Sequence, residues 1–169
     1  MNGVEWVRSW HKQRRYDLMV STCGQYYRKS TEKPKLHGAL EREIKCLDAA
    51  KSMGLTKIQK IVDGVVDRSG TSYVITEHCG KNLTRSRVPL DWRQQLDIID
   101  EELMLLQVEH SIYHNDVQMR NLFVDGSALT LLDFDLASFK DPNRRAMLRP
   151  EFLCCDRIRD KIINKWGVR

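Results

Sequence analysis

The sequence has no apolar run that approaches the ~20 residues needed to cross a bilayer. Its first ten residues do not form a signal peptide, because Glu5, Arg8 and Ser9 interrupt any apolar stretch. These two absences predict a protein of the cytoplasm or the nucleus. The five cysteines include no CxxC pair and no histidine at a matching spacing, which argues against a disulfide framework or a zinc site.

Glycine and proline are also scarce, with nine and four in 169 residues. Together with 41% hydrophobic and 30% charged residues, this composition is typical of a globular protein rather than a disordered or fibrous one. The length fits one domain, or a unit of two lobes that share a cleft. We therefore treat residues 1–169 as a single domain.

Positive charge is concentrated at one end of the chain. The net charge is +5, and the whole excess lies in residues 140–169, which hold nine basic residues against four acidic ones. Such a tail can bind an acidic partner, or its apolar side chains Phe152, Leu153, Ile158, Ile162 and Trp166 can dock on the domain. We favour docking, and nucleic acid is not the partner that we expect.

Hydrophobic periodicity predicts two long helices and three pairs of strands. One helix covers residues 36–53 and ends at Gly54, a residue suited to a left-handed cap. The other helix begins with Asp91 as its N-cap. Its predicted buried stripe consists of Trp92, Leu96, Ile99, Leu103 and Leu106. Strand pairs are predicted within residues 16–30, 58–77 and 122–132. This order suits an α+β protein in which a small sheet-rich lobe precedes a helical one.

One polar stretch has the residue types that phosphoryl transfer requires. Residues 114–121 read HNDVQMRN, and two short strands then lead to Asp133, Phe134 and Asp135. The reaction needs a carboxylate that orients or deprotonates the attacking hydroxyl, and oxygen ligands that hold Mg²⁺ on the nucleotide. Asp and Asn are also common turn residues, but this spacing can bring Asp116, Asn121 and Asp133 into one cleft.

The same stretch resembles the catalytic loop of protein kinases, H-R-D-x-x-x-x-N, followed by the D-F-G metal-binding motif. Residues 72–80 resemble the fifth strand, gatekeeper and hinge of that family, and residues 41–44 resemble its αC helix. The resemblance covers about residues 18–138, and it is greater to abbreviated kinase-like proteins of fungi, viruses and pathogens than to a full regulated kinase. It implies a two-lobed protein-kinase-like fold with a small antiparallel-sheet N-lobe (about residues 1–79) and a truncated helical C-lobe (about residues 80–169).

The resemblance also implies a role for each matching residue. Asp116 would be the catalytic base, and Asn121 and Asp133 would bind Mg²⁺, with Mn²⁺ as an alternative metal. Lys29, with Arg28 as its rival, would pair with Glu43 and anchor the α/β-phosphates of ATP. Adenine would lie beneath the hinge, which consists of the gatekeeper Thr76 followed by Glu77, His78 and Cys79. The implied reaction transfers the γ-phosphate of ATP to a protein hydroxyl.

Several positions depart from the family pattern. Asn115 replaces the motif arginine, so the cation that couples to a phosphorylated activation segment is missing. Asp135 replaces the motif glycine, which adds a metal ligand or stiffens the turn. Gln118 replaces a common lysine, and Arg120 resembles the tyrosine-kinase form of the loop. No glycine-rich phosphate loop precedes Tyr26, because only Gly3 and Gly24 occur before it.

Two other functions fit the sequence. The missing glycine loop favours a pseudokinase or kinase mimic that acts by binding a partner protein. The histidine–aspartate loop is also shared by small-molecule kinases of the aminoglycoside-phosphotransferase type and by RNA-modification kinases. The hinge and helix patterns favour the protein-kinase interpretation over the small-molecule one.

Overall fold

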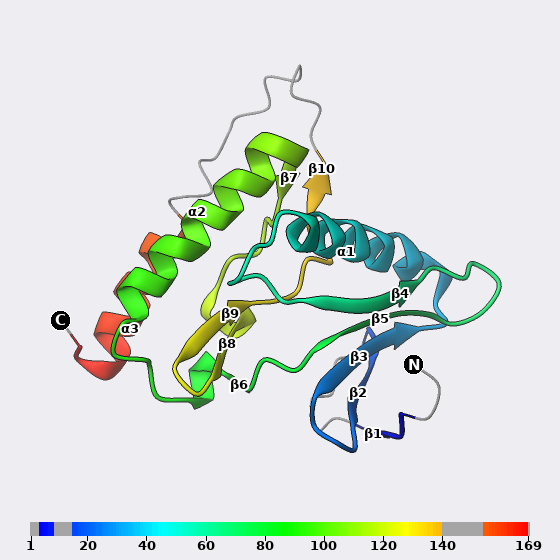
Figure 1. Ribbon diagram of the computed structural model, residues 1–169, viewed down its shortest axis with the longest axis horizontal. Coiled ribbons are helices and arrows are strands. Elements are labelled where there is room, and N and C mark those ends of the chain that lie inside the picture. The colour runs from blue at the N-terminus through cyan, green and yellow to red at the C-terminus, as the bar shows by residue number, and fades with distance from the viewer. Residues whose placement is uncertain (1–3, 9–14, 140–153, 169) are drawn as a thin grey trace.

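The protein folds around an antiparallel sheet of five strands, in a computed structural model that describes residues 4–8, 15–139 and 154–168. The strand order across the sheet is β1-β2-β3-β5-β4 (Figure 1). The strands are β1 (Trp6–Arg8), β2 (Asp17–Ser21), β3 (Tyr26–Thr31), β4 (Ile61–Val65) and β5 (Ser72–Glu77). The hairpins predicted within residues 16–30 and 58–77 are both present. The sequence does not predict β1, because three residues are too few to show an alternation.

Helix α1 (Pro34–Ser52) packs against β4 and β5 and crosses one face of the sheet (Figure 1). Its end has the hydrogen bonds of a Schellman motif, in which Leu55 N–H donates to the Ala50 carbonyl and Gly54 N–H to that of Lys51. Gly54 has a φ of +68°, as its predicted capping role requires. Glu43 lies on this helix and is buried.

The chain leaves the sheet at Gly80 and enters β6 (Lys81–Asn82) and the 3₁₀ turn η1 (Leu83–Arg85). Strand β6 pairs with β8 (Leu122–Asp125), which pairs in turn with β9 (Ala128–Leu131). Gly80 has a φ of +79°, and a Cβ placed on it would lie 2.0 Å from the Val124 carbonyl oxygen. Only glycine allows the backbone to pass so close to β8 in this conformation. The link between the sheet and the rest of the fold is thus fixed sterically.

The helical part consists of α2 (Trp92–His110) and α3 (Cys154–Trp166), which pack against each other. All five residues of the predicted apolar stripe on α2 are at most 3% exposed. Asp91 is the N-cap, as predicted. Its carboxylate accepts from the Gln95 amide (2.7 Å), and no side-chain cap forms. No helix of the described residues is long and apolar enough to span a bilayer.

The C-terminal helix is docked on the domain. Cys155, Ile158 and Ile162 of α3 are at most 1% exposed. The Arg159 guanidinium forms ion pairs with Asp97 (2.6 Å) and Asp100 (3.0 Å) of α2. Part of the positive charge of the tail is therefore used inside the molecule. Phe152 and Leu153, also expected to take part in docking, lie outside the described residues.

Short elements lie within the polar stretch and on either side of it. They are β7 (Ile112–Tyr113), the 3₁₀ turn η2 (Met119–Asn121) and β10 (Ser138–Phe139), and β7 pairs with β10. The HNDVQMRN loop therefore runs from β7 to β8, and Asp133 follows β9. The predicted hairpin of residues 122–132 is confirmed as β8 and β9, with Gly126 at a φ of +57° in its turn. The arrangement matches the predicted α+β, kinase-like fold with a small sheet lobe and a helical part.

Candidate functional site

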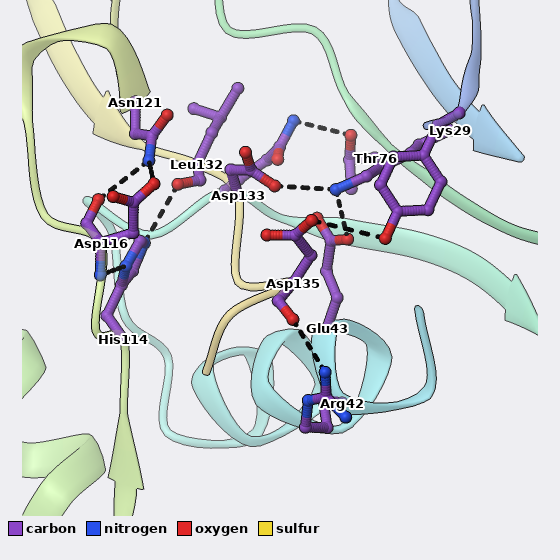
Figure 2. Close-up of polar contacts among 12 residues, drawn as sticks. Lys29, Arg42, Glu43, Thr76, His114, Asp116, Asn121, Leu132, Asp133 and Asp135 are labelled. Carbon is purple, nitrogen blue, oxygen red and sulfur yellow. Dashed lines mark hydrogen bonds and ion pairs between the residues drawn. The ribbon is translucent and has the colours of Figure 1, made fainter. Parts of the chain in front are cut away.

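A buried lysine joins three parts of the fold. Lys29 on β3 donates to the Glu43 carboxylate of α1 (2.8 Å) and to the Asp133 carboxylate that follows β9 (2.7 Å). The side chains of Lys29 and Glu43 are only 8% and 4% exposed, while that of Asp133 is 25% exposed. Figure 2 shows the lysine ammonium between the two carboxylates. Residues that are 104 positions apart in the chain thus form one charged cluster.

The alternation of β3 decides between the two candidate cations. Successive strand residues point to opposite faces of a sheet, and Lys29 points toward α1 and Asp133. Arg28 instead lies over the Tyr73 ring, with its guanidinium carbon 5.0 Å from the ring centroid. The structure therefore pairs Lys29, and not Arg28, with Glu43.

Electrostatics keep both partners of the Lys29–Asp133 pair charged. Burial lowers the pKa of Lys29, but the carboxylates of Glu43, Asp133 and Asp135 outweigh burial and hold it above its usual value. Burial likewise raises the pKa of Asp133, yet the lysine more than offsets this effect and the pKa lies below its usual value. Asp133 also has a φ of +72°, an uncommon conformation for a residue other than glycine.

The buried His114 positions the loop that carries Asp116. The Asp116 N–H donates to its Nδ1 (3.2 Å), so Nε2 carries the proton and donates to the Leu132 carbonyl (3.1 Å). Its ring lies 4.3 Å from that of Phe134, which is fully buried. Burial lowers the pKa of His114, so the ring is neutral and acts as a structural link between the loop and the segment after β9.

Three side chains of the same loop hold the Asp116 carboxylate. The Asn121 amide donates to its Oδ2 (2.9 Å) and to its backbone carbonyl (2.9 Å). Gln118 donates to Oδ1, and Arg120 forms an ion pair with Oδ2 (3.1 Å). The Asp116 side chain is 15% exposed, and Arg120 beside it is 66% exposed. The carboxylate is therefore oriented by its own loop and remains accessible from one side.

Asn115, in the place of the motif arginine, has a structural function here. Its φ is +62°, a conformation that asparagine tolerates better than most residues. Its amide donates to the Leu136 carbonyl (3.1 Å) and to the Ser138 hydroxyl (2.9 Å). The segment after Asp135 is thus tied to the loop by neutral hydrogen bonds.

The predicted adenine-binding residues continue from the end of β5. Thr76 is buried and its hydroxyl accepts from the Gln59 amide (2.7 Å). The backbone N–H of His78 is bonded to the turn between β2 and β3 (2.8 Å). Burial raises the pKa of the Cys79 thiol to about 12, and its Sγ donates to the Glu77 carbonyl (3.4 Å). These contacts fix the path of the predicted hinge.

The donor atoms at Asp133 and Asn121 suit a magnesium ion. The amide nitrogen of Asn121 faces Asp116, and its oxygen points away from that carboxylate (Figure 2). Mg²⁺ prefers such hard oxygen ligands and is usually held by one or two carboxylates together with substrate phosphates. The described residues form no cluster of three or more His, Cys, Asp or Glu side chains able to hold a metal alone. A Mg²⁺ ion held by Asp133 and Asn121 would need further ligands, such as water or substrate phosphates.

Two residues at the site have no counterpart in the sequence-based expectations. Tyr16, which precedes β2 and is 5% exposed, donates its hydroxyl to the Asp135 carboxylate (3.4 Å). Arg42 on α1 donates to the Asp135 backbone carbonyl (3.2 Å). No spacing rule links positions that are about one hundred residues apart, so the sequence carries no signal for either contact.

Comparison with known proteins identifies the fold. No family model matches the chain, and no curated protein matches its sequence. Among solved structures, the chain is similar to the PK-1 kinase of Cydia pomonella granulovirus, with a TM-score of 0.65 and 16% sequence identity. The match covers 80% of this chain and 54% of the viral one, so the chain spans about half the length of that kinase. At this identity the likeness shows the fold alone: the protein has a kinase-like fold.

Proposed function

We propose that the protein is an ATP- and Mg²⁺-dependent phosphotransferase that transfers the γ-phosphate to a hydroxyl of a protein substrate. The observation that carries this proposal is the Lys29–Glu43 and Lys29–Asp133 pair of ion contacts, assembled on three separate elements. A buried ammonium between two carboxylates has a large desolvation cost, and such charged clusters occur preferentially at functional sites. A lysine held in this way beside a metal-type donor set suits a phosphate ligand.

Each residue has a distinct part in the proposed reaction. Asp116 accepts the proton of the acceptor hydroxyl, and the Asn121 amide keeps that carboxylate oriented. Lys29, aligned by Glu43, binds the α/β-phosphates, and the backbone of residues 76–79 binds adenine. Asp133 and Asn121 would hold Mg²⁺ or Mn²⁺, which when bound neutralises phosphate charge and fixes the orientation of the transferred group.

Thermal denaturation with and without nucleotide tests the proposal. A ligand that binds only the folded state stabilises it by about 2.7 kcal/mol at a concentration of 100 Kd. We expect ATP with Mg²⁺ to raise the melting temperature of the wild type. A folded protein whose melting curve does not move at millimolar ATP and Mg²⁺ would contradict the proposal.

Two matched variants separate chemistry from binding. Asp116→Asn should abolish transfer of labelled phosphate and keep the nucleotide-induced thermal shift, because this carboxylate faces the acceptor. Asp133→Asn should lose most of the shift as well, because it removes an anionic metal ligand. An equal loss of nucleotide affinity in both variants would refute the assigned roles.

A second candidate function is a kinase-like binding protein without transferase activity. One observation favours it: the sequence has no glycine-rich phosphate loop before Tyr26. The same melting experiment distinguishes the two functions. A binding protein of this kind would show no Mg²⁺-dependent shift with ATP and would co-purify with a partner regardless of the Asp116→Asn change.

A further inference from the structure

Tyr16 and Asp135 form a contact across the predicted phosphate site. Tyr16 immediately precedes β2, and Asp135 lies two residues after Asp133. The phenol hydroxyl donates to Asp135 Oδ2 (3.4 Å), and the Tyr16 ring covers the Lys29 ammonium, which lies 4.4 Å from the ring centroid. Both residues are buried, at 5% and 7% exposure. We call this pair the clasp.

The clasp leaves Lys29 without an open direction. A lysine ammonium has three N–H donors. One donates to Glu43, one to Asp133, and the Tyr16 ring occupies the remaining side at cation–π distance. A phosphate oxygen cannot reach the ammonium unless one of these three partners moves. Of the three, the ring is the partner whose removal leaves the charged pairs intact.

Asp135 is held so that it can serve as the acceptor for Tyr16. Its backbone carbonyl accepts from Arg42 of α1 (3.2 Å), and Figure 2 shows its side chain beside Glu43. A glycine at this position, as in the family motif, would offer the phenol no carboxylate. The aspartate that replaces the motif glycine at position 135 and the tyrosine at position 16 therefore act as a pair.

The exposure of Lys29 agrees with the closed state. Its side chain is only 8% exposed, so the ammonium is covered, whereas the side chain of Asp133 beside it is 25% exposed.

We propose that the Tyr16–Asp135 clasp is a gate that closes the phosphate site and opens when nucleotide binds. The inference rests on the proposed function, because it assumes that Lys29 binds phosphate. A closed gate lowers the apparent affinity by the fraction of molecules that are open. A variant with a looser gate should therefore have a lower stability without nucleotide and a higher affinity for nucleotide, two effects of opposite sign.

The test measures both effects in the same variants. Binding of a non-hydrolysable ATP analogue with Mg²⁺ is measured by calorimetry, and melting is measured without ligand. Tyr16→Phe keeps the ring and removes the hydrogen bond, and we expect about fivefold tighter binding together with a lower melting temperature. Asp135→Gly should likewise bind the analogue more tightly and melt at a lower temperature. The double variant should differ little from either single variant in both measurements.

Tyr73→Phe is the matched control. Tyr73 donates its hydroxyl to the Asp63 carboxylate (3.1 Å), on the face of the sheet that carries Arg28 and is opposite to Lys29. Its loss should lower stability and leave the affinity for the analogue unchanged. This control separates a gating contact from an ordinary phenol–carboxylate bond.

Each other outcome overturns the inference. Unchanged affinity in Tyr16→Phe would show that the contact is only structural, and weaker binding in Asp135→Gly would show that the carboxylate is itself a ligand for metal or nucleotide. If the wild type binds the analogue and no variant binds it more tightly, the gate fails and the proposed function stands. If neither the wild type nor any variant binds it, the proposed function fails and the gate fails with it.

Discussion

Replacing Lys29 by methionine should destabilise the protein much more than a single exposed charge change would. Methionine keeps the length of the aliphatic stem but removes the ammonium that contacts Glu43 and Asp133. Removing one partner of a buried ion pair costs about 3–5 kcal/mol, because the remaining charge has no compensation. Since the Asp133 side chain is 25% exposed and Glu43 only 4%, most of the cost arises at Glu43.

The expected size can be checked by thermal melting. For a protein of this length, 1 kcal/mol corresponds to roughly 2–4 °C, so Lys29→Met should lower the melting temperature by about 6–20 °C. Arg28→Met is the matched control, because it removes a cation from the neighbouring residue of the same strand. Arg28 makes a cation–π contact with Tyr73 worth about 0.5–1 kcal/mol, so this variant should lose no more than about 4 °C.

A double variant identifies the cause of the loss. Lys29→Met combined with Glu43→Gln removes the buried carboxylate along with its partner, and should melt at a higher temperature than Lys29→Met alone. The reasoning is refuted if Lys29→Met melts within about 2 °C of Arg28→Met. It is also refuted if the Glu43→Gln change destabilises the Lys29→Met background further.

Three further predictions concern the scaffold of the site. Ile162→Ala on the docked face of α3 should cost about 2–5 kcal/mol in urea unfolding, and Asn164→Ala on its exposed face should cost under about 0.5; equal losses would show that α3 is not docked. Gly80→Ala should lower the unfolding free energy by well above the ~1–2 kcal/mol of left-handed strain, because the new Cβ meets the Val124 carbonyl. Gly24→Ala, at a similar φ with open space around it, should cost about that strain alone. Similar losses of stability in the two variants would contradict the close approach at Gly80. Burial lowers the pKa of His114, so the stability that it contributes is complete above the unfolded value of about 6.5 and declines as pH falls below it; an unfolding free energy that declines just as steeply in a His114→Asn variant would exclude this histidine as the source.

Local pattern was enough to predict much of the fold. The period of four and three in α2, the glycine cap of α1 and the turn residues of the β2–β3 and β8–β9 hairpins each depend on neighbours within a few positions. Such signals are readable because helix and strand periodicity is a short-range property. The unpredicted strands β1, β6, β7 and β10 have two or three residues each. They form because a partner strand elsewhere in the chain pairs with them, and the local sequence contains no signal for that partner.

The site shows the same division between local and long-range information. The spacing of Asp116 and Asn121 within one loop could be read from the sequence, and the structure joins the two side chains by a 2.9 Å hydrogen bond. The identity of the lysine could not be settled, because Arg28 and Lys29 are adjacent and both are cations. The choice depends on which face of β3 packs toward α1, because only the side chain on that face can reach Glu43. Roles in binding or catalysis remain proposals that the variants above test.

Three departures from the kinase motifs, at Asn115, Gln118 and Asp135, are each matched by a contact that the structure contains. Asn115 cannot supply the charge of the missing arginine, but its amide bonds Leu136 and Ser138 and so holds the segment after Asp135 without a phosphate. Gln118 donates to Asp116 where a lysine often stands in the family. Asp135 receives the hydroxyl of a tyrosine that covers Lys29. A site that had merely decayed would lose contacts at such positions one by one. Here Asn115, Gln118 and Asp135 each have a specific hydrogen-bonded partner, which supports the proposal of a functional site over one that has been abandoned.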